Sequence, residues 1–146
     1  MLAGRYRAAV SGLLLAGLIL ATASCATQAP LSQDDARADR AARQWLAVVD
    51  RGEYERSWQQ ASAMFQNGID QDAWVEAVRN ARAGTATPNQ RELVSIAHTR
   101  QLPGVPENDY VVLVYASQFD DRPPIQETLT LARGDDELKT AGYFLR

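Results

Sequence analysis

The spacing of the apolar residues changes near Gln90, and this change constrains the fold more than any other feature of the chain. Before Gln90, apolar residues recur every three or four positions, which is the period of a helix with one buried face. After it they alternate with polar residues, and β-branched and aromatic residues dominate, as in strands. Helices followed by strands predict an α+β fold in which the helices pack on a sheet.

The first half of the chain carries signals for about three helices. Ser32 is placed to cap a helix that Gly52 ends. A second, short helix is expected over residues 53–60, followed by a less regular stretch over residues 61–68. A third is expected over residues 70–84, which begin with a capping Asp and end with Gly.

Four strands are expected in the second half, over residues 91–101, 110–119, 125–133 and 138–145. The links between them are short and rich in turn-forming residues, which favours antiparallel neighbours, because a parallel pair needs a crossover of a dozen or more residues. The second of these strands is apolar on both faces, so we place it centrally in the sheet. The expected fold is α+β, with about three helices packed on one face of a curved four-stranded antiparallel meander.

The first residues are typical of an export signal. Arg5 and Arg7 precede an uncharged apolar run over residues 8–21, and a series of small residues follows. This run has 14 residues, whereas a helix that spans a bilayer needs roughly 20. We therefore expect a cleaved signal rather than a permanent membrane span.

Two cleavage sites are compatible with this signal. Residues 21–23 (Ala-Thr-Ala) fit ordinary signal cleavage, whereas residues 22–25 (Thr-Ala-Ser-Cys) resemble the bacterial lipobox, which is cut before a cysteine whose thiol becomes lipidated. Cys25 is the chain's only cysteine, and it stands where a lipoprotein needs it. We expect a lipoprotein signal peptide over residues 1–24, lipidated Cys25 and a linker over residues 25–31, and a single domain over residues 32–146.

The lipobox resemblance also predicts a location. The acyl chains attached at Cys25 would hold the protein permanently on a membrane, at about 0.8 kcal/mol per buried CH₂. Ala26 follows the cysteine, and in lipoproteins of enteric type this resembles sorting to the outer membrane, facing the periplasm. The alternative is a soluble periplasmic protein with a free cysteine.

Composition excludes several classes of function. The chain has 15 basic and 18 acidic residues and a formal net charge of −3, the wrong sign for binding nucleic acid. One cysteine and one histidine cannot form a structural zinc site. No phosphate-binding loop or nucleophile motif is present in the sequence. We therefore expect no metal, no cofactor and no catalytic role.

Aromatic, glycine and charged positions are spread over the domain in a distinctive order: Trp45, 49–54, Ser57, Trp58, Ala61, Ser62, Phe65, Trp74, Arg79, Arg82, 102–104, Tyr110, Tyr115, Glu127, Thr128 and 141–146. This set resembles a family of exported bacterial proteins of unknown function, numbered 4019. The resemblance implies an exported domain and no defined activity. The order of elements also resembles the cystatin-like and nuclear-transport-factor-like α+β cones, which include both enzymes and binding modules, so fold alone does not choose the function.

Glu127 is the leading candidate for chemistry. Strand alternation places it on an apolar face with Leu129, where an isolated charge would be costly. One interpretation is a buried acid–base group of a small cone-fold enzyme of isomerase or dehydratase type, with His98 and Tyr115 as the other candidates. The interpretation that we favour is a structural carboxylate, held by Arg79, Arg82, Arg100 or Tyr115. An open cavity beside Glu127 would support the enzyme, and an arginine closed over it would not.

Five aromatic residues are candidates for a ligand- or partner-binding pocket, although core packing is the commoner use of such residues. They are Trp45, Trp58, Trp74, Tyr110 and Tyr143.

Two finer expectations concern the strands. Strict alternation places Val94, Ile96 and His98 on one face and Leu93 on the other. Glycine weakens a strand unless something approaches it closely, so we expect Trp45 or Trp58 to pack over Gly142.

The sequence as a whole favours a non-catalytic cell-envelope lipoprotein whose domain binds a protein partner or a small ligand at the membrane surface. The alternative is the small cone-fold enzyme described above.

Overall fold

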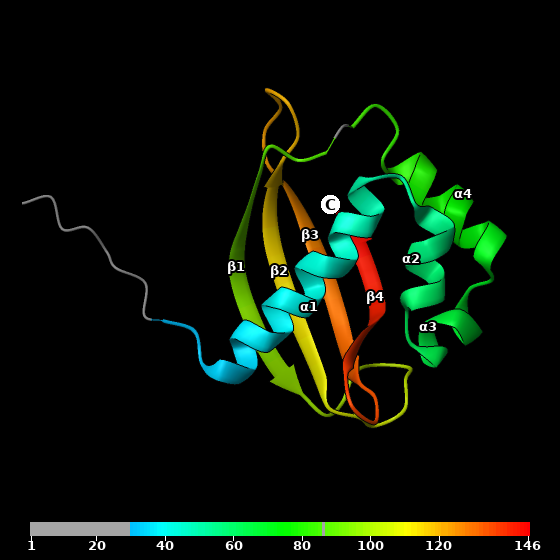
Figure 1. Cartoon of the computed structure of the whole chain (residues 1–146), viewed down its shortest axis with the longest axis vertical. Coiled ribbons are helices and arrows are strands. Elements are labelled where there is room, and N and C mark those ends of the chain that lie inside the picture. Colours follow the sequence, from blue (N-terminus) through cyan, green and yellow to red (C-terminus); the bar gives the residue numbers. More distant parts are fainter. Residues whose placement is uncertain (1–29, 86) are drawn as a thin grey trace, which may run out of the picture.

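The structure is a computed structural model that describes residues 30–85 and 87–146, in which four helices precede four strands (Figure 1). The predicted signal peptide, Cys25 and most of the predicted linker lie outside the described residues. Within these residues no helix is long and apolar enough to cross a membrane.

The helices are α1 (Gln33–Asp50), α2 (Tyr54–Gln60), α3 (Ala63–Gly68) and α4 (Gln71–Ala81). The stretch expected to be less regular forms α3, so there are four helices rather than about three. Ser32 Oγ accepts a hydrogen bond from the Asp35 backbone N–H at 3.1 Å, as its predicted capping role requires. Gly52, at φ +74°, follows α1 and donates its N–H to the Val49 carbonyl at 2.9 Å. This left-handed position is why glycine ends the helix there.

The strands are β1 (Gln90–Thr99), β2 (Tyr110–Gln118), β3 (Ile125–Arg133) and β4 (Leu138–Leu145). Every neighbouring pair is antiparallel, and the spatial order is β1-β2-β3-β4. The predicted meander with β2 in the interior of the sheet, and with it the α+β class, is therefore confirmed.

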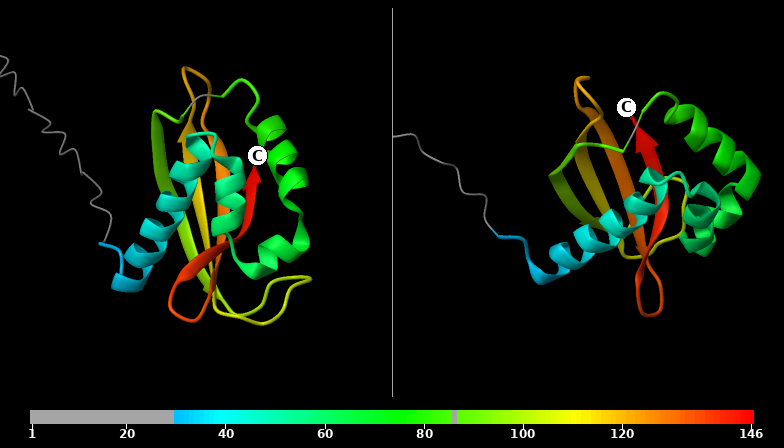
Figure 2. Two further views of the ribbon diagram at one scale, coloured as in Figure 1. Left: turned by 45° about the vertical axis from the view of Figure 1, so that its right-hand side comes forward. Right: turned by 45° about the horizontal axis from the view of Figure 1, so that its top comes forward.

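The helices lie on one side of the sheet. α1 crosses the sheet face, and α2, α3 and α4 gather beside β4 (Figure 2). The core fills the space between these layers and includes Leu46 from α1, Leu113 from β2 and Leu129 from β3, all fully buried. The described helices leave the other face of the sheet open, where Phe144 is 63% exposed.

One buried serine connects three helices of this core. Trp45 of α1 donates its Nε1–H to the Ser57 carbonyl at 2.8 Å, and Trp74 of α4 donates its Nε1–H to Ser57 Oγ at 2.9 Å. The two indole rings lie 5.9 Å apart. Because the indoles bury their rings and satisfy their N–H groups on α2, both serve the packing of the core.

β1 contains a bulge that overturns the expected alternation. Its register to β2 shifts between Leu93 and Ser95, because a bulge inserts one extra residue into one of two paired strands. Leu93 and Ile96 both pack against the core, and Val94 is 61% exposed. Placing Leu93 and Ile96 on opposite faces was therefore wrong. The bulge puts four side chains of β1 on the face toward α1: Arg91, Leu93, Ile96 and His98.

The expectation that Trp45 or Trp58 packs over Gly142 was also wrong. A Cβ added at Gly142 would meet atoms of Phe144 and Thr130 at 3.6–3.8 Å. It is the next residue, Tyr143, whose ring lies 5.5 Å from that of Trp45. Since successive residues of a strand point to opposite faces, Gly142 points away from the helices.

We predict that Gly142→Ala leaves the free energy of unfolding unchanged or raises it by about 0.5–1 kcal/mol, because alanine in a strand loses less backbone entropy than glycine. Urea unfolding monitored by tryptophan fluorescence measures this. Gly52→Ala is the matched control, and it should destabilise because alanine is strained at φ +74°. A larger loss for Gly142→Ala than for Gly52→Ala would contradict the assignment of Gly142 to the open face.

Candidate functional site

Glu127 is fully buried, and both of its carboxylate oxygens are occupied by donors. Oε1 accepts hydrogen bonds from Arg82 Nη2 at 2.8 Å and from the Tyr143 hydroxyl at 2.6 Å. Oε2 accepts from Arg91 Nε at 2.6 Å and from the Ser117 hydroxyl. The residue that caps the C-terminal end of α4 and strands β1, β2 and β4 thus each supply one donor to this carboxylate on β3.

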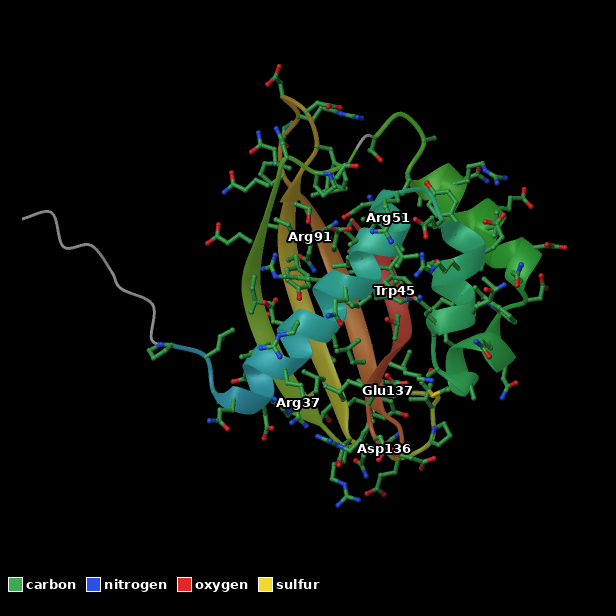
Figure 3. All side chains as sticks on the ribbon, in the orientation of Figure 1. Arg37, Trp45, Arg51, Arg91, Asp136 and Glu137 are labelled. Atoms are coloured by element: carbon green, nitrogen blue, oxygen red, sulfur yellow. The ribbon has the colours of Figure 1, made fainter. Side chains whose placement is uncertain are left out.

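Asp50, the last residue of α1, bridges the same two arginines. Arg82 Nη1 lies 2.9 Å from Asp50 Oδ1, and Arg91 Nη1 lies 2.8 Å from Asp50 Oδ2. None of the four charged side chains is more than 10% exposed. Two acids and two bases balance, so this buried charge network of Asp50, Arg82, Arg91 and Glu127 is neutral. Figure 3 shows Arg91 near the C-terminal end of α1, where Asp50 lies.

Proton equilibria reinforce this arrangement. Burial works against the charge on Arg91, but Asp50 and Glu127 outweigh it and raise the pKa of Arg91 above its ordinary value. Burial, together with the nearby Glu127 carboxylate, raises the pKa of Tyr143 far above the physiological range. The Tyr143 hydroxyl therefore stays protonated and remains a donor to Glu127.

The contacts of Glu127 favour the structural interpretation of this carboxylate. Each oxygen has two donors, so the lone pairs that would take a substrate proton are engaged. Of the partners considered from the sequence, only Arg82 donates a hydrogen bond to the Glu127 carboxylate. Arg91 could not be predicted as a partner of Glu127, because strict alternation along β1 does not reveal the bulge that places Arg91 and Ile96 on the same face.

The other two acid–base candidates lie in different environments. His98 is 53% exposed, and its Nε2 is 2.7 Å from Asp35 Oδ1. The Tyr115 hydroxyl donates to Asp39 Oδ1 at 2.8 Å. His98 is paired with Val111 of β2 and Glu127 with Tyr115, which separates the two pairs by about 13 Å along the strand. These contacts do not assemble His98, Tyr115 and Glu127 into one site.

The five aromatic candidates do not line one common pocket either. Trp45, Trp74 and Tyr143 pack together in the core. Trp58 is partly buried and donates its Nε1–H to the Ile69 carbonyl at 2.8 Å. The Tyr110 hydroxyl donates to the Pro106 carbonyl at 2.6 Å.

An open groove of about 830 Å³ lies between α1, α2 and the start of β4. Figure 3 shows Arg37 and Arg51 toward opposite ends of α1, with Trp45 between them. Six of the fourteen residues that line the groove are charged and four more are polar. We call it the α1–α2–β4 groove, and it is lined by Arg37, Ala41, Gln44, Trp45, Val48, Arg51, Arg56, Gln59, Gln60, Asp136, Glu137, Leu138, Lys139 and Thr140.

Thr140 is the unusual residue of this groove. Thr140 is only 1% exposed, yet its hydroxyl oxygen has no hydrogen-bond partner among the described residues. Buried hydroxyls are nearly always paired in folded proteins. Of the candidates from the sequence, Trp45 alone lines the groove. The other lining residues were not predicted, because the groove forms only when three segments that are distant in the sequence meet.

Within the described ranges, no group of three or more His, Cys, Asp or Glu side chains could hold a metal.

We predict that Glu127→Gln lowers the free energy of unfolding by about 3–5 kcal/mol, because it leaves two buried guanidiniums facing one carboxylate. Chemical denaturation at pH 7 measures the loss. Glu92→Gln, at an exposed position of β1, is the matched control and should change stability by less than about 0.5 kcal/mol. A Glu127→Gln variant of normal stability that abolished a proton-transfer activity would refute the structural assignment.

A second prediction concerns the contact between β1 and the start of α1. Hydrogen bonds from His98 and then Ser32 lower the pKa of Asp35 below its ordinary value. A lowered carboxyl pKa stabilises the fold at higher pH, and this contribution is lost as pH falls through the lowered pKa. We expect His98→Ala to raise the pKa of Asp35 and to be less stable than the wild type near pH 5, with the difference closing toward about pH 2.

Carboxyl-detected NMR titration measures the pKa of Asp35 directly. Gln90→Ala, an exposed change elsewhere on β1, is the control and should leave that pKa unchanged. An unchanged Asp35 pKa in both His98→Ala and Ser32→Ala would show that these contacts do not persist in solution.

Comparison with known proteins identifies the family. Residues 41–143 match the model of a family described as "Protein of unknown function (DUF4019)". A solved 2.5 Å structure from Catenulispora acidiphila shares 19% identity, covers 77% of this chain and 89% of its own, and has a TM-score of 0.44. No curated protein matches the chain, and the wider likeness to cystatin-like and nuclear-transport-factor-like cones is not confirmed. Because the family match spans most of the described domain, the chain belongs to the DUF4019 family of proteins of unknown function.

Proposed function

We propose that this protein is a non-catalytic lipoprotein of the bacterial cell envelope, anchored through Cys25, whose domain binds a partner or ligand at the membrane surface. The α1–α2–β4 groove is the binding site in this proposal.

One contrast within the domain carries the proposal. Glu127 is the one fully buried acid among the described residues, and its two carboxylate oxygens accept hydrogen bonds from four side chains of the protein itself. The groove, in contrast, is open and presents arginine and glutamine side chains to solvent. Ligand sites are concave and use placed polar groups to orient the ligand, and the many polar side chains of this groove suit a polar ligand.

The short tether supports a role close to the membrane. Ser32, the cap of α1, stands seven positions after Cys25, with six residues between them. Even a fully extended chain of that length spans at most about 25 Å. A domain anchored at Cys25 would therefore be held close to the lipid surface.

Metabolic labelling of the full chain in a diderm bacterium tests the anchoring. We expect wild-type protein to incorporate an alkyne-tagged palmitate and to sediment with membranes, and Cys25→Ser to lose the label because the acceptor thiol is gone. Ser24→Ala keeps a small residue before the cysteine and should stay labelled, which controls for disturbance of the signal.

An unlabelled wild-type protein in the soluble periplasmic fraction would overturn the lipoprotein proposal. In that outcome, cleavage after Ala23 would be the correct interpretation of the signal.

A further inference from the structure

We infer that the α1–α2–β4 groove binds an extended peptide of about six residues that ends in a free carboxylate, with this carboxylate held by Arg51 and Arg56. The inference rests on the proposed function and names the ligand class of the same groove.

Charge at one end of the groove identifies the carboxylate position. Arg51 Nε lies 2.5 Å from Glu53 Oε1, and Arg56 Nη1 lies 2.8 Å from Glu53 Oε2. Two guanidiniums thus share one carboxylate and leave an excess positive charge. Each guanidinium has further N–H donors, and arginine pairs well with carboxylates through two parallel hydrogen bonds. The described domain has 13 basic and 18 acidic residues, so this positive end is a local feature of an acidic protein.

The length of the groove indicates an extended ligand. Arg37 and Arg51 both line it, and fourteen positions of helix between them correspond to about 21 Å along α1. A peptide in an extended conformation covers that distance with about six residues. A single amino acid or a small anion would fill only one end.

The middle of the groove offers partners for peptide groups. Gln44 of α1 and Gln59 and Gln60 of α2 are exposed and line it. Each side-chain amide both donates and accepts, as a peptide bond does. Thr140 also lines the groove, but its hydroxyl oxygen is buried, so the glutamine amides supply the partners for peptide groups.

Two other ligand classes fit less well. An acyl chain needs an apolar channel, whereas ten of the fourteen lining residues are charged or polar. A sugar ring usually stacks on an exposed aromatic face, but Trp45, the only aromatic side chain of the groove, is 5% exposed.

Selection from a peptide library tests the inference. The full chain, solubilised from membranes in detergent, is incubated with a random-sequence hexapeptide library that has free C-terminal carboxylates, and retained peptides are identified by mass spectrometry. The retained peptides are then made as acids and as C-terminal amides, and their Kd values are measured by fluorescence anisotropy.

We expect amidation to weaken binding at least tenfold, and the double variant Arg51→Ala/Arg56→Ala to lose the same factor for the acids. Arg79→Ala/Arg100→Ala removes two exposed arginines outside the groove and should bind like the wild type. Thr140→Val should leave the Kd unchanged and the thermal midpoint equal to that of the wild type or higher, because it removes a buried, unpaired hydroxyl and keeps the shape of the side chain.

Three outcomes would overturn the inference: no retained peptide, equal affinity of acids and amides, or equal affinity of the Arg51→Ala/Arg56→Ala variant and the wild type. The labelling experiment on Cys25 is independent. Labelled protein that retains no peptide refutes this ligand class alone, and unlabelled protein that binds the acids refutes only the anchoring.

Discussion

The rest of the domain depends on the buried charge network of Asp50, Arg82, Arg91 and Glu127. These residues come from α1, the C-terminal cap of α4, β1 and β3, so one set of ion pairs connects the helical half of the chain to the sheet. Because taking charges out of water is expensive, the network is tolerated only when all four members are present and aligned. The network therefore adds little net stability to the correct fold, but it penalises any packing of α1, β1 and β3 in which the ion pairs are incomplete.

Around this network, the fold separates two tasks. The aromatic core, joined through Ser57, holds α1, α2 and α4 together. The side chains on the outer sides of α1 and α2 are not needed for the core, and the α1–α2–β4 groove lies between these outer sides and β4. Trp45 belongs to both regions, since it packs in the core and its edge lines the groove. The rigid core thus sets the spacing of the groove walls before any ligand arrives.

Local signals made most of the fold predictable from sequence. Ser32 and Gly52 bound α1 because their side-chain and backbone chemistry acts within a few residues. Arg91 was missed because a bulge leaves no reliable mark in a strand pattern, and one extra residue reverses every face assignment after it. Arg82, in contrast, was among the predicted partners of Glu127. The groove residues were not predicted, since their meeting depends on how α1, α2 and β4 pack rather than on any motif.

The same bulge at Val94 affects how neighbouring copies of the protein can contact one another. β1 is an edge strand of the sheet, and regular edge strands can pair with those of other molecules. A bulge breaks the even row of backbone hydrogen-bonding groups and increases the local twist, which disfavours strand pairing between two copies along this edge. For a protein that we propose is confined to a membrane surface, where neighbouring copies meet often, this irregularity would keep the molecules separate without a covering partner.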